Sequence, residues 1–306
     1  MVNLFAKNEQ NMNAVERVLH YTELPSERAE ATPDDPPMNW PSSGQISFTN
    51  VDLSYREGLP LTLKQVNFTI NPGEKVGIVG RTGAGKTSLL QALFRIVELQ
   101  NGKIEIDGID ISNIGLSVLR RSIALVPQDS TLFLGTMRNN LDPQGLRTDA
   151  ELIAVLQRAL LLPSEGTTDA AAEAKFSLDC TVGDEGSNFS AGEKQLLALC
   201  RALVKNSPII VLDEATSSVD VETDAKLQRT IKKEFAHSTL LCIAHRLNTI
   251  VYYDRVLVMD GGRVAEFDTV LNLYDNESSI FRSLCNEANL QRADILRIRA
   301  EQRQYS

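Results

Sequence analysis

Residues 80–87 carry the pattern with the clearest chemistry in the sequence. They read Gly-Arg-Thr-Gly-Ala-Gly-Lys-Thr, between an apolar stretch at Val76–Val79 and a predicted helix. Glycines let the backbone turn so that successive N–H groups and the start of the helix face phosphate oxygens. Lys86 would neutralise the β- and γ-phosphates, and the Thr87 hydroxyl would bind Mg²⁺. The spacing therefore predicts a nucleotide phosphate site, and a plain strand–helix turn with an exposed lysine is the weaker interpretation. The residues expected to contact the nucleotide here are Gly80, Arg81, Thr82, Gly83, Ala84, Gly85, Lys86, Thr87 and Ser88.

Two carboxylates follow a second, wholly apolar stretch. Ile209–Leu212 leads directly to Asp213 and Glu214. Adjacent carboxylates at the end of a buried strand are costly unless they meet a cation or a reacting group. Asp213 would hold Mg²⁺, directly or through water, and Glu214 would act as the general base on an attacking water. The alternative, a strand that ends in solvated acids, is weakened by the phosphate loop elsewhere in the chain.

Two further apolar stretches also end in polar side chains. Ile123–Val126 leads to Gln128 after one proline, and Thr239–Ala244 leads to His245. A lone glutamine or histidine is more often structural, but ligands of open α/β sheets lie beyond the carboxyl ends of the strands. Gln128 is also a candidate Mg²⁺ ligand. The residues expected to converge at one edge are Gly80, Gln128, Glu214 and His245.

The stretch from Asn188 to Gln195 opens a helix with an apolar face. Ser190 is a good N-cap, and Glu193 completes a capping box three residues later, which gives a purely structural interpretation. Small residues such as Gly192 and a free hydroxyl at a helix N-terminus also suit an anion. Because the loop at 80–87 already surrounds the phosphates of this chain, this second anion would belong to ATP held by a partner.

The order of predicted elements indicates the fold class. A region with period-two alternation at residues 46–55 comes first and predicts antiparallel strands. Short apolar strands then alternate with helices, which predicts a parallel sheet covered by helices. The strands are expected at 76–79, 123–126, 209–212, 239–244 and 256–259, and the helices at 87–98, 192–205 and about 222–235. Residues 135–180 are predicted to be mainly helical, with a solvated insertion at 164–174.

Both ends of the chain are predicted to lie outside the core. Residues 3–21 form an amphipathic helix, and residues 22–44 collect prolines and lose periodicity, so they read as an extended linker. A flexible terminus is the alternative. The compact domain is expected to span 45–285, and residues 286–306 to form a surface helix.

Composition narrows the class of protein. Of the 306 residues, 42% are hydrophobic and 23% charged, as in ordinary globular chains. Asp and Glu (40) exceed Lys and Arg (31), giving a net charge of −9, which argues against nucleic acid or anionic lipid as the main partner. No run of apolar residues is long enough to span a bilayer, so the 306-residue chain by itself is expected to be soluble. The cysteines are widely spaced and histidines are few, which argues against a zinc site and favours reduced thiols.

Taken in order, these motifs resemble the nucleotide-binding domain of ATP-binding-cassette (ABC) proteins. The resemblance covers residues 45 to about 275 and implies a P-loop NTPase (RecA-like) parallel-sheet core, an antiparallel β subdomain and an α-helical subdomain. It implies that Tyr55 stacks on adenine and that Asp220 contacts nucleotide. The matching motifs are Walker A (Gly80–Thr87), the Q-loop residue Gln128, the signature (Phe189–Glu193), Walker B (Ile209–Asp213, then Glu214), the D-loop (Ser217–Asp220) and the switch His245.

Longer stretches are similar to the second nucleotide-binding domain of C-subfamily (multidrug-resistance-associated) exporters. Residues 134–143 and 244–250 carry that likeness, and residues 189–196 and 265–269 look most like fungal oligomycin-resistance-type members. The likeness implies the C-terminal part of a full transporter at the cytoplasmic face of a membrane. It also implies two partners: a second nucleotide-binding domain, joined head to tail through ATP, and the transmembrane domains.

The signature departs from the usual Leu-Ser-Gly-Gly-Gln. Ala191 adds a methyl group near the phosphate, and Glu193 adds a negative charge. In the C-subfamily, such a signature faces the weaker of two ATP sites, while this domain's own Walker motifs belong to the stronger one.

The expected activity is ATP hydrolysis coupled to transport, with ATP and Mg²⁺ as cofactors. Glu214, His245, Gln128 and Lys86 are the expected catalytic residues, and Thr87, Gln128 and Asp213 the expected metal ligands. A metabolic P-loop kinase, a soluble ABC ATPase and an ATP-binding regulatory domain without transport remain alternatives at this point.

Overall fold

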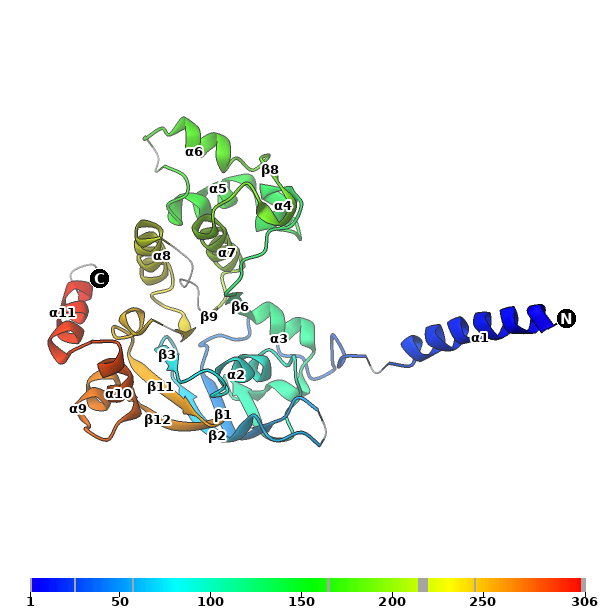
Figure 1. The fold of residues 1–306 in the computed structure, drawn as a ribbon. Helices are drawn as coiled ribbons and strands as arrows, with labels where there is room; N and C mark the ends of the chain where they lie inside the picture. The colour runs from blue at the N-terminus through cyan, green and yellow to red at the C-terminus, as the bar shows by residue number, and fades with distance from the viewer. Residues whose placement is uncertain are drawn as a thin grey trace.

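A six-stranded sheet lies at the centre of the molecule (Figure 1). The computed structural model describes residues 2–24, 26–56, 58–163, 166–213, 220–244 and 246–303. The strand order is β12-β11-β3-β10-β9-β6, and all neighbouring pairs are parallel except β11 with β12. The bounds are β3 Lys75–Val79, β6 Ile123–Val126, β9 Ile209–Asp213, β10 Thr239–Ile243, β11 Arg255–Asp260 and β12 Arg263–Thr269. The predicted parallel strands are confirmed.

Strand β12 is absent from the sequence prediction. Gly261 and Gly262, with φ of 52° and 83°, form the tight turn that folds β12 back on β11. A glycine pair between two apolar runs is a known hairpin signal, because both residues accept positive φ without strain. That signal was present in the sequence.

A second, antiparallel sheet has the order β2-β1-β4-β5. Its strands are β1 Ile46–Leu53, β2 Leu63–Ile70, β4 Asn101–Ile106 and β5 Ile109–Asp110. Side chains from both sheets and from helix α2 (Lys86–Leu93) share one hydrophobic cluster, which includes Ile46, Ile78 and Leu89. The predicted antiparallel region is therefore confirmed, and its core anchors the helix that follows the phosphate loop.

Helix α2 is shorter than the predicted 87–98. Arg95 lies just beyond its end with φ of 48°, in the left-handed region, so the helix stops at Leu93. The buried guanidinium of Arg95 donates to the carbonyls of Ile111 and Ile114, 2.7 Å away in each case. These hydrogen bonds fix the turn and explain the early end of the helix.

The helical part of the molecule lies above the sheet edge in Figure 1. It holds α4 Met137–Leu141, α5 Asp149–Arg158, α6 Ala170–Lys175 and α7 Ala191–Lys205, with a short ribbon of β7 Gly135–Thr136 and β8 Thr181–Val182. Within the solvated insertion predicted at 164–174, the described residues 166–174 are mostly exposed, but α6 begins there because Asp169 caps the N–H groups of Ala171 and Ala172.

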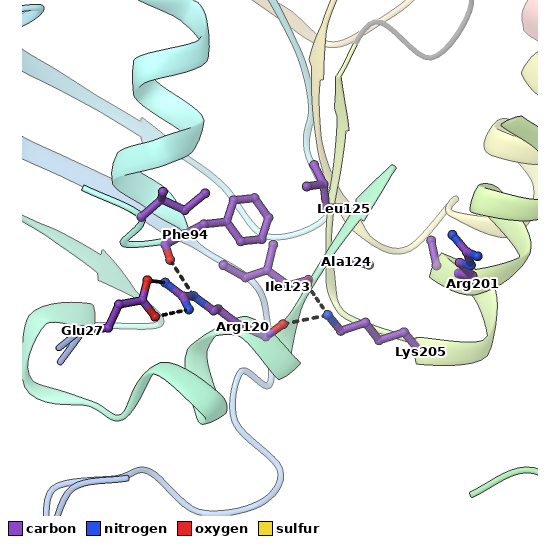
Figure 2. Close-up of a pocket in the computed structure, with 10 residues that line it drawn as sticks. Glu27, Phe94, Arg120, Ile123, Ala124, Leu125, Arg201 and Lys205 are labelled. Atoms are coloured by element: carbon purple, nitrogen blue, oxygen red, sulfur yellow. Dashed lines mark hydrogen bonds and ion pairs between the residues drawn. The ribbon is translucent and has the colours of Figure 1, made fainter. Parts of the chain in front are cut away.

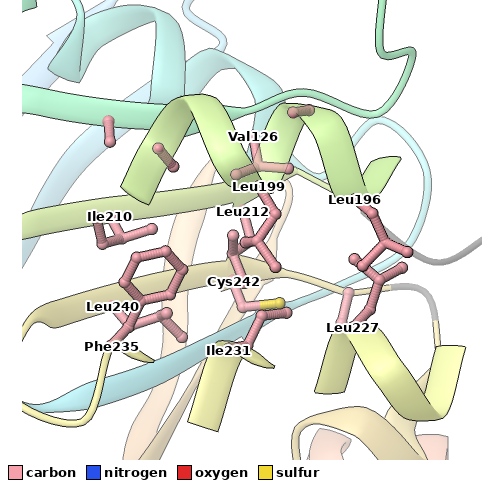
Figure 3. Packing of buried hydrophobic residues seen from close by; sticks show 14 of the residues in the cluster. Val126, Leu196, Leu199, Ile210, Leu212, Leu227, Ile231, Phe235, Leu240 and Cys242 are labelled. Carbon is pink, nitrogen blue, oxygen red and sulfur yellow. The ribbon is translucent and has the colours of Figure 1, made fainter. Parts of the chain in front are cut away.

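Helices α7 and α8 (Val221–Glu234) cover the sheet through a shared core. Figure 3 shows Leu196 and Leu199 of α7 facing Leu227 and Ile231 of α8, with Leu212 of β9 between them. All of these side chains are nearly or fully buried. The packing fixes the start of α7 relative to the carboxyl ends of the strands.

Helix α1 (Val2–Thr22) projects from the body (Figure 1), as predicted, and its described apolar side chains are exposed. The linker after it differs from the prediction, because residues 26–44 pack on the domain. Glu27 forms a bidentate pair with Arg120 at 2.9 and 3.0 Å. Leu116 N donates to Ala29 O, and Asp35 accepts from Gly115 N at 2.6 Å. The linker has no helix or strand over 26–44, but several of its polar groups hydrogen-bond to the domain surface.

The end of this linker is held by one carboxylate. Asp107 follows β4 and accepts from the backbone N–H groups of residues 42–45 at 2.7–3.2 Å, and from the Ser43 hydroxyl at 2.6 Å. Trp40 Nε1 donates to the carbonyl of Ile106 at 3.2 Å. These hydrogen bonds hold the last residues of the linker against the end of β4.

The C-terminal tail is also more closely packed than predicted. It contains α9 Val270–Asp275, α10 Ile280–Glu287 and α11 Arg292–Arg303. Ile295 of α11 is fully buried, and Arg299 donates to the carbonyls of Val251 and Tyr253 at 2.9 Å. Helix α11 is therefore a surface helix that also inserts one side chain into the main core. The remaining elements are α3 Leu116–Ser122 and the 3₁₀ turns Ile111–Asn113, Asp184–Gly186 and Leu247–Thr249. Among the ranges given above, no helix is both long and apolar enough to cross a membrane.

Candidate nucleotide-binding site

The loop between β3 and α2 has a backbone that depends on glycine. Gly80, Gly83 and Gly85 have φ of 153°, 82° and 103°. At Gly80 a Cβ would lie 2.3 Å from the carbonyl oxygen of Met259, so no larger residue fits. Gly85 is the N-cap of α2 and has no side chain to cap the helix. The N–H groups of the first turn are thus left for an anion.

Lys86 places its ammonium group inside this loop. The residue is 7% exposed, and Nζ donates to the carbonyls of Gly80 at 2.7 Å and Arg81 at 3.1 Å. An ammonium group carries three N–H donors and can exchange partners at little cost. The lysine is therefore positioned where a bound phosphate would sit, with the loop held around it.

The other residues of the loop divide into an exposed and a buried set. Arg81 and Thr82 are exposed, and the Arg81 guanidinium lies 3.9 Å from the Glu287 carboxylate at the end of α10. Ala84 is buried, and its carbonyl accepts from Gly262 N at 3.1 Å. The buried alanine ties the loop to the β11–β12 turn, while the exposed residues are free to meet a ligand.

The strand ends meet at one edge, as the sequence predicted. Ile243 of β10 pairs with Ile78 of β3 on one side and with Asp213 of β9 on the other. Leu212 of β9 pairs in turn with Val126 of β6. At this edge Gly80 follows β3 directly, and Gln128 follows β6 by two residues. Glu214 and His245 lie outside the described residues, and their positions stay predictions.

Three described residues offer oxygen ligands of the kind that Mg²⁺ prefers. Thr87 is the exposed second residue of α2, Asp213 is the half-buried last residue of β9, and Gln128 is exposed beyond β6. A hydroxyl, a carboxylate and an amide oxygen suit a hard cation that keeps some of its waters. The donor set fits Mg²⁺.

Tyr55 lies against the helix of the phosphate loop. It follows β1, is 43% exposed, and its hydroxyl is 2.8 Å from the Ser88 hydroxyl on α2. Two residues predicted separately to contact nucleotide are thus brought together. The exposed ring next to α2 is suited to stacking on a base.

Comparison with known proteins identifies the family. The family model described as "ABC transporter" matches residues 63–217, which is just over half of the chain. The chain belongs to the ABC transporter family. It is 50% identical over 96% of its length to the ABC-type transporter cicA of Emericella nidulans, and 52% identical over 94% to the oligomycin resistance ATP-dependent permease YOR1 of Saccharomyces cerevisiae. These matches cover 22% and 20% of those proteins, so the chain spans about a fifth of the curated relatives it matches.

A solved structure supports the same assignment. A bacterial Atm1-family ABC exporter with ATP bound superposes with a TM-score of 0.80 at 31% identity, over 94% of this chain and 49% of that one. The resemblance to fungal transporters of this family is confirmed, and so is the mixed α/β fold of a P-loop NTPase.

The ABC signature forms the start of α7. Ser190 is the N-cap and, with Glu193, makes the predicted capping box: Glu193 N donates to Ser190 Oγ at 3.2 Å, and Ser190 N donates to Glu193 Oε2 at 2.8 Å. Gly192 is buried, whereas Ser190 and Ala191 are exposed. The exposed part of the helix start is therefore a hydroxyl and a methyl group, with the Glu193 carboxylate folded back on its own helix.

Asp220, at the end of the D-loop, caps helix α8. Its carboxylate accepts from the N–H groups of Glu222 at 3.1 Å and Thr223 at 3.0 Å. The hydrogen bonds from Thr223, followed by those from neighbouring backbone groups, hold the pKa of Asp220 below its ordinary value. In the structure, Asp220 thus caps the start of α8, and its contact with nucleotide stays a prediction. Ser217–Val219 lie outside the described residues.

Gln195 is a site residue that the sequence analysis did not single out. It lies on α7, is 7% exposed, and its amide hydrogen-bonds with Ser130 and with the carbonyls of Pro127 and Gln128. A polar side chain on the apolar face of this helix, next to Leu196 and Leu199, was the available signal. It connects the signature helix to the Q-loop.

A pocket of about 540 Å³ opens between the end of α2, the start of β6 and the end of α7 (Figure 2). Phe94, Ile96 and Leu125 give it an apolar floor, and the last two are well exposed. The rim is basic: Lys205 donates to the carbonyls of Arg120 and Ile123 at 2.7 and 2.6 Å, as Figure 2 shows. The pocket lies beside the strand that leads to Gln128.

Proposed function

We propose that this chain is the Mg-ATP-binding and ATP-hydrolysing domain of an ABC exporter, corresponding to the second nucleotide-binding domain of a C-subfamily transporter. The single observation that carries the proposal is the burial of Lys86 inside a glycine-dependent loop at the carboxyl edge of the sheet. Residues 45–285 would form the nucleotide-binding domain. Residues 1–44 would lead into it from a membrane domain, and residues 286–306 would form its tail.

The described residues supply positioning and charge for phosphoryl transfer. Lys86 and the N–H groups at the start of α2 would hold the β- and γ-phosphates, and the Tyr55 ring would hold the base. Thr87 and Asp213, with Gln128, would hold Mg²⁺, which supplies a positive charge to the phosphate oxygens. Such a reaction depends mainly on orientation and charge stabilisation, which fixed donors of this kind provide.

The hydrolytic step is assigned to residues beyond the described strand ends. Glu214 follows Asp213 and would accept a proton from the attacking water, and His245 with Gln128 would bind the γ-phosphate. These roles rest on the sequence motifs and on the alignment of β9, β10 and β6 at one edge. A positioned general base contributes about 10²–10⁴-fold to a rate.

Two partners are proposed for the remaining surfaces. Ser190 and the start of α7 would contact ATP bound by a second nucleotide-binding domain, giving a head-to-tail sandwich at the cytoplasmic face of a membrane. The pocket lined by Phe94, Ile96 and Leu125 would receive a segment of the transmembrane domains, because it has an open apolar floor and lies beside β6, the strand that leads to Gln128. The names and greater lengths of the relatives support this proposal.

ATPase assays over a range of protein concentrations test the proposal. We expect the rate per chain to rise with concentration as sandwiches form, and to fall by about 10²–10⁴-fold in Glu214→Gln. Binding of ATP by Glu214→Gln should persist, which separates loss of chemistry from loss of binding. Hydrolysis that continues at the parental rate in Glu214→Gln would remove Glu214 from the mechanism.

A further inference from the structure

The unusual glutamate of the signature is paired with a lysine from another element. Lys175, the last residue of α6, donates from Nζ to Glu193 Oε1 at 2.6 Å. The two residues are separated by 18 positions in the sequence and come from α6 and the signature helix α7. The negative charge that Glu193 adds to the signature is therefore balanced inside this chain.

Two buried aromatic rings hold the lysine in place. The ammonium group lies 5.8 Å from the ring centroids of both Phe176 and Phe189, which are 5% and 6% exposed. The rings are themselves in contact, with centroids 5.9 Å apart. Attraction between a cation and a ring face adds to the ion pair. Phe189 is the first residue of the signature, so Lys175 contacts two signature residues at once.

The pairing also determines how Glu193 is used. Its Oε2 accepts from Ser190 N at 2.8 Å while its Oε1 accepts from Lys175, so each oxygen has a partner. Burial alone would raise the pKa of Glu193, but the hydrogen bonds from Lys175 and Ser190 outweigh it and hold the pKa below the ordinary value. The carboxylate is thus ionised and turned toward its own helix, and the ammonium group of Lys175 balances its negative charge.

We propose that Lys175 is a positioning residue of the signature: by neutralising Glu193 and keeping it in the capping box, it allows the start of α7 to accept the γ-phosphate of ATP bound by the partner domain. The inference rests on the proposed function. Without Lys175, an unbalanced carboxylate in the first turn would repel the phosphate and offset the positive end of the helix. Helix α6 would then contribute a positioning residue, Lys175, to the phosphate-contacting surface of the signature.

A purely structural ion pair is the competing explanation, and the two differ in how mutations combine. If Lys175 acts through the charge of Glu193, removing that charge makes Lys175 dispensable. If the ion pair only stabilises the fold, Glu193→Gln alone weakens association as much as Lys175→Ala does, whereas a neutralising role predicts that Glu193→Gln alone keeps the parental association. Lys103 offers a matched control, because it pairs with Glu105 at 2.8 Å on β4 with nearly the same exposure (48% and 23%, against 43% and 23% for Lys175 and Glu193).

The test is ATP-driven association of the chain, measured by sedimentation velocity with Mg-ATP. All variants carry Glu214→Gln so that the nucleotide persists. We expect Lys175→Ala to weaken association about tenfold and Lys175→Arg to restore it. In the Glu193→Gln background, Lys175→Ala should change association by less than about twofold, and Lys103→Ala should change nothing. An equal loss from Lys175→Ala in both backgrounds, no loss in either, or a loss in Glu193→Gln alone that matches the loss in Lys175→Ala overturns the proposal.

Two further measurements separate this inference from the proposed function. If no variant associates although ATP binds, a sandwich of two copies of this chain is contradicted, and the NMR titration then decides whether Lys175 neutralises Glu193. Carboxyl NMR of the monomeric chain tests the pairing without any association. The pKa of Glu193 should rise in Lys175→Ala and stay unchanged in Lys103→Ala. A Glu193 pKa that is the same in Lys175→Ala and in the parent overturns the inference.

Discussion

The Oε1 atom of Gln195 accepts a hydrogen bond from the Ser130 hydroxyl at 2.9 Å. The same amide donates from Nε2 to the carbonyl of Pro127 at 3.4 Å and to that of Gln128. One buried carboxamide thus joins the helix that starts at the signature to the loop that carries Gln128. Because an unpaired buried amide is costly, a movement of this loop is expected to move α7 with it.

Replacing Gln195 should loosen the Q-loop before it affects nucleotide affinity. Gln195→Ala removes the bonds to Ser130 and to both loop carbonyls, while the phosphate loop is left intact. We expect amide hydrogen exchange over 128–133 to become at least about tenfold faster, with ATP affinity within about threefold of the parent. Gln157→Ala, on the neighbouring helix α5, is the control. Unchanged exchange over 128–133 would show that the amide does not hold this loop.

Tyr55 is expected to act through its ring more than through its hydroxyl. Tyr55→Ala removes a stacking surface and should weaken ATP binding about tenfold. Tyr55→Phe keeps the ring and loses only the 2.8 Å contact with Ser88, so binding should stay within about threefold. Fluorescence titration with an ATP analogue measures both. Equal losses in the two variants would argue against base stacking.

The pair of Glu27 and Arg120 should keep the linker on the domain. Exposed ion pairs contribute little to global stability, so we expect the unfolding midpoint of Glu27→Gln to stay near that of the parent. Detachment of the linker from the domain should become easier, because the two hydrogen bonds to Arg120 anchor the start of the linker. Limited trypsin cleavage after Arg28 should become about threefold faster or more. Glu23→Gln, outside this contact, should leave the cleavage rate unchanged.

Asp107 should make the docking of the linker dependent on pH. Burial raises its pKa, but the hydrogen bonds from Ser43, Gly44 and Gln45 prevail, so the folded pKa lies below the unfolded one. The ionised carboxylate therefore contributes stability that is fully present above about pH 4 and is lost as the pH falls through the folded pKa. We expect Asp107→Asn to lower the free energy of unfolding by about 1–2 kcal/mol at pH 7.

Urea unfolding at a series of pH values checks this prediction. The difference between the parent and Asp107→Asn should shrink as the pH drops below about 4, because the parental carboxyl then becomes neutral as well. A difference that is the same at pH 7 and pH 3 would mean that the charge of Asp107 does not matter. The asparagine variant keeps a residue type that tolerates the positive φ of 49° at this position, so backbone strain is matched.

The sheet and the phosphate loop could be predicted from the sequence because their signals are local. A short, wholly apolar run such as Ile209–Leu212 is typical of a buried strand. The spacing of Gly80, Gly85 and Lys86 is set by the backbone conformation of the phosphate loop. The order of strands then follows from the family resemblance. The start of α7 was equally predictable, because Ser190 and Glu193 form a capping box within four residues.

The errors come from contacts between residues far apart in the sequence. Nothing near Asp107 indicates that it binds the backbone of residues 42–45, and nothing near Ile295 indicates that it enters the main core. Lys175 was not singled out, because its partner, Glu193, lies on another helix. Gln195 alone gave a local signal, since it interrupts an apolar face.

The most direct test of the central claim is calorimetric titration of the chain with Mg-ATP, beside Lys86→Ala. The account predicts one bound nucleotide per chain, and an affinity about 10- to 100-fold lower in Lys86→Ala, because charge-assisted contacts to the phosphates are lost. Lys103→Ala should bind as the parent does. Equal affinity in Lys86→Ala and the parent would contradict the claim that this loop binds the phosphates.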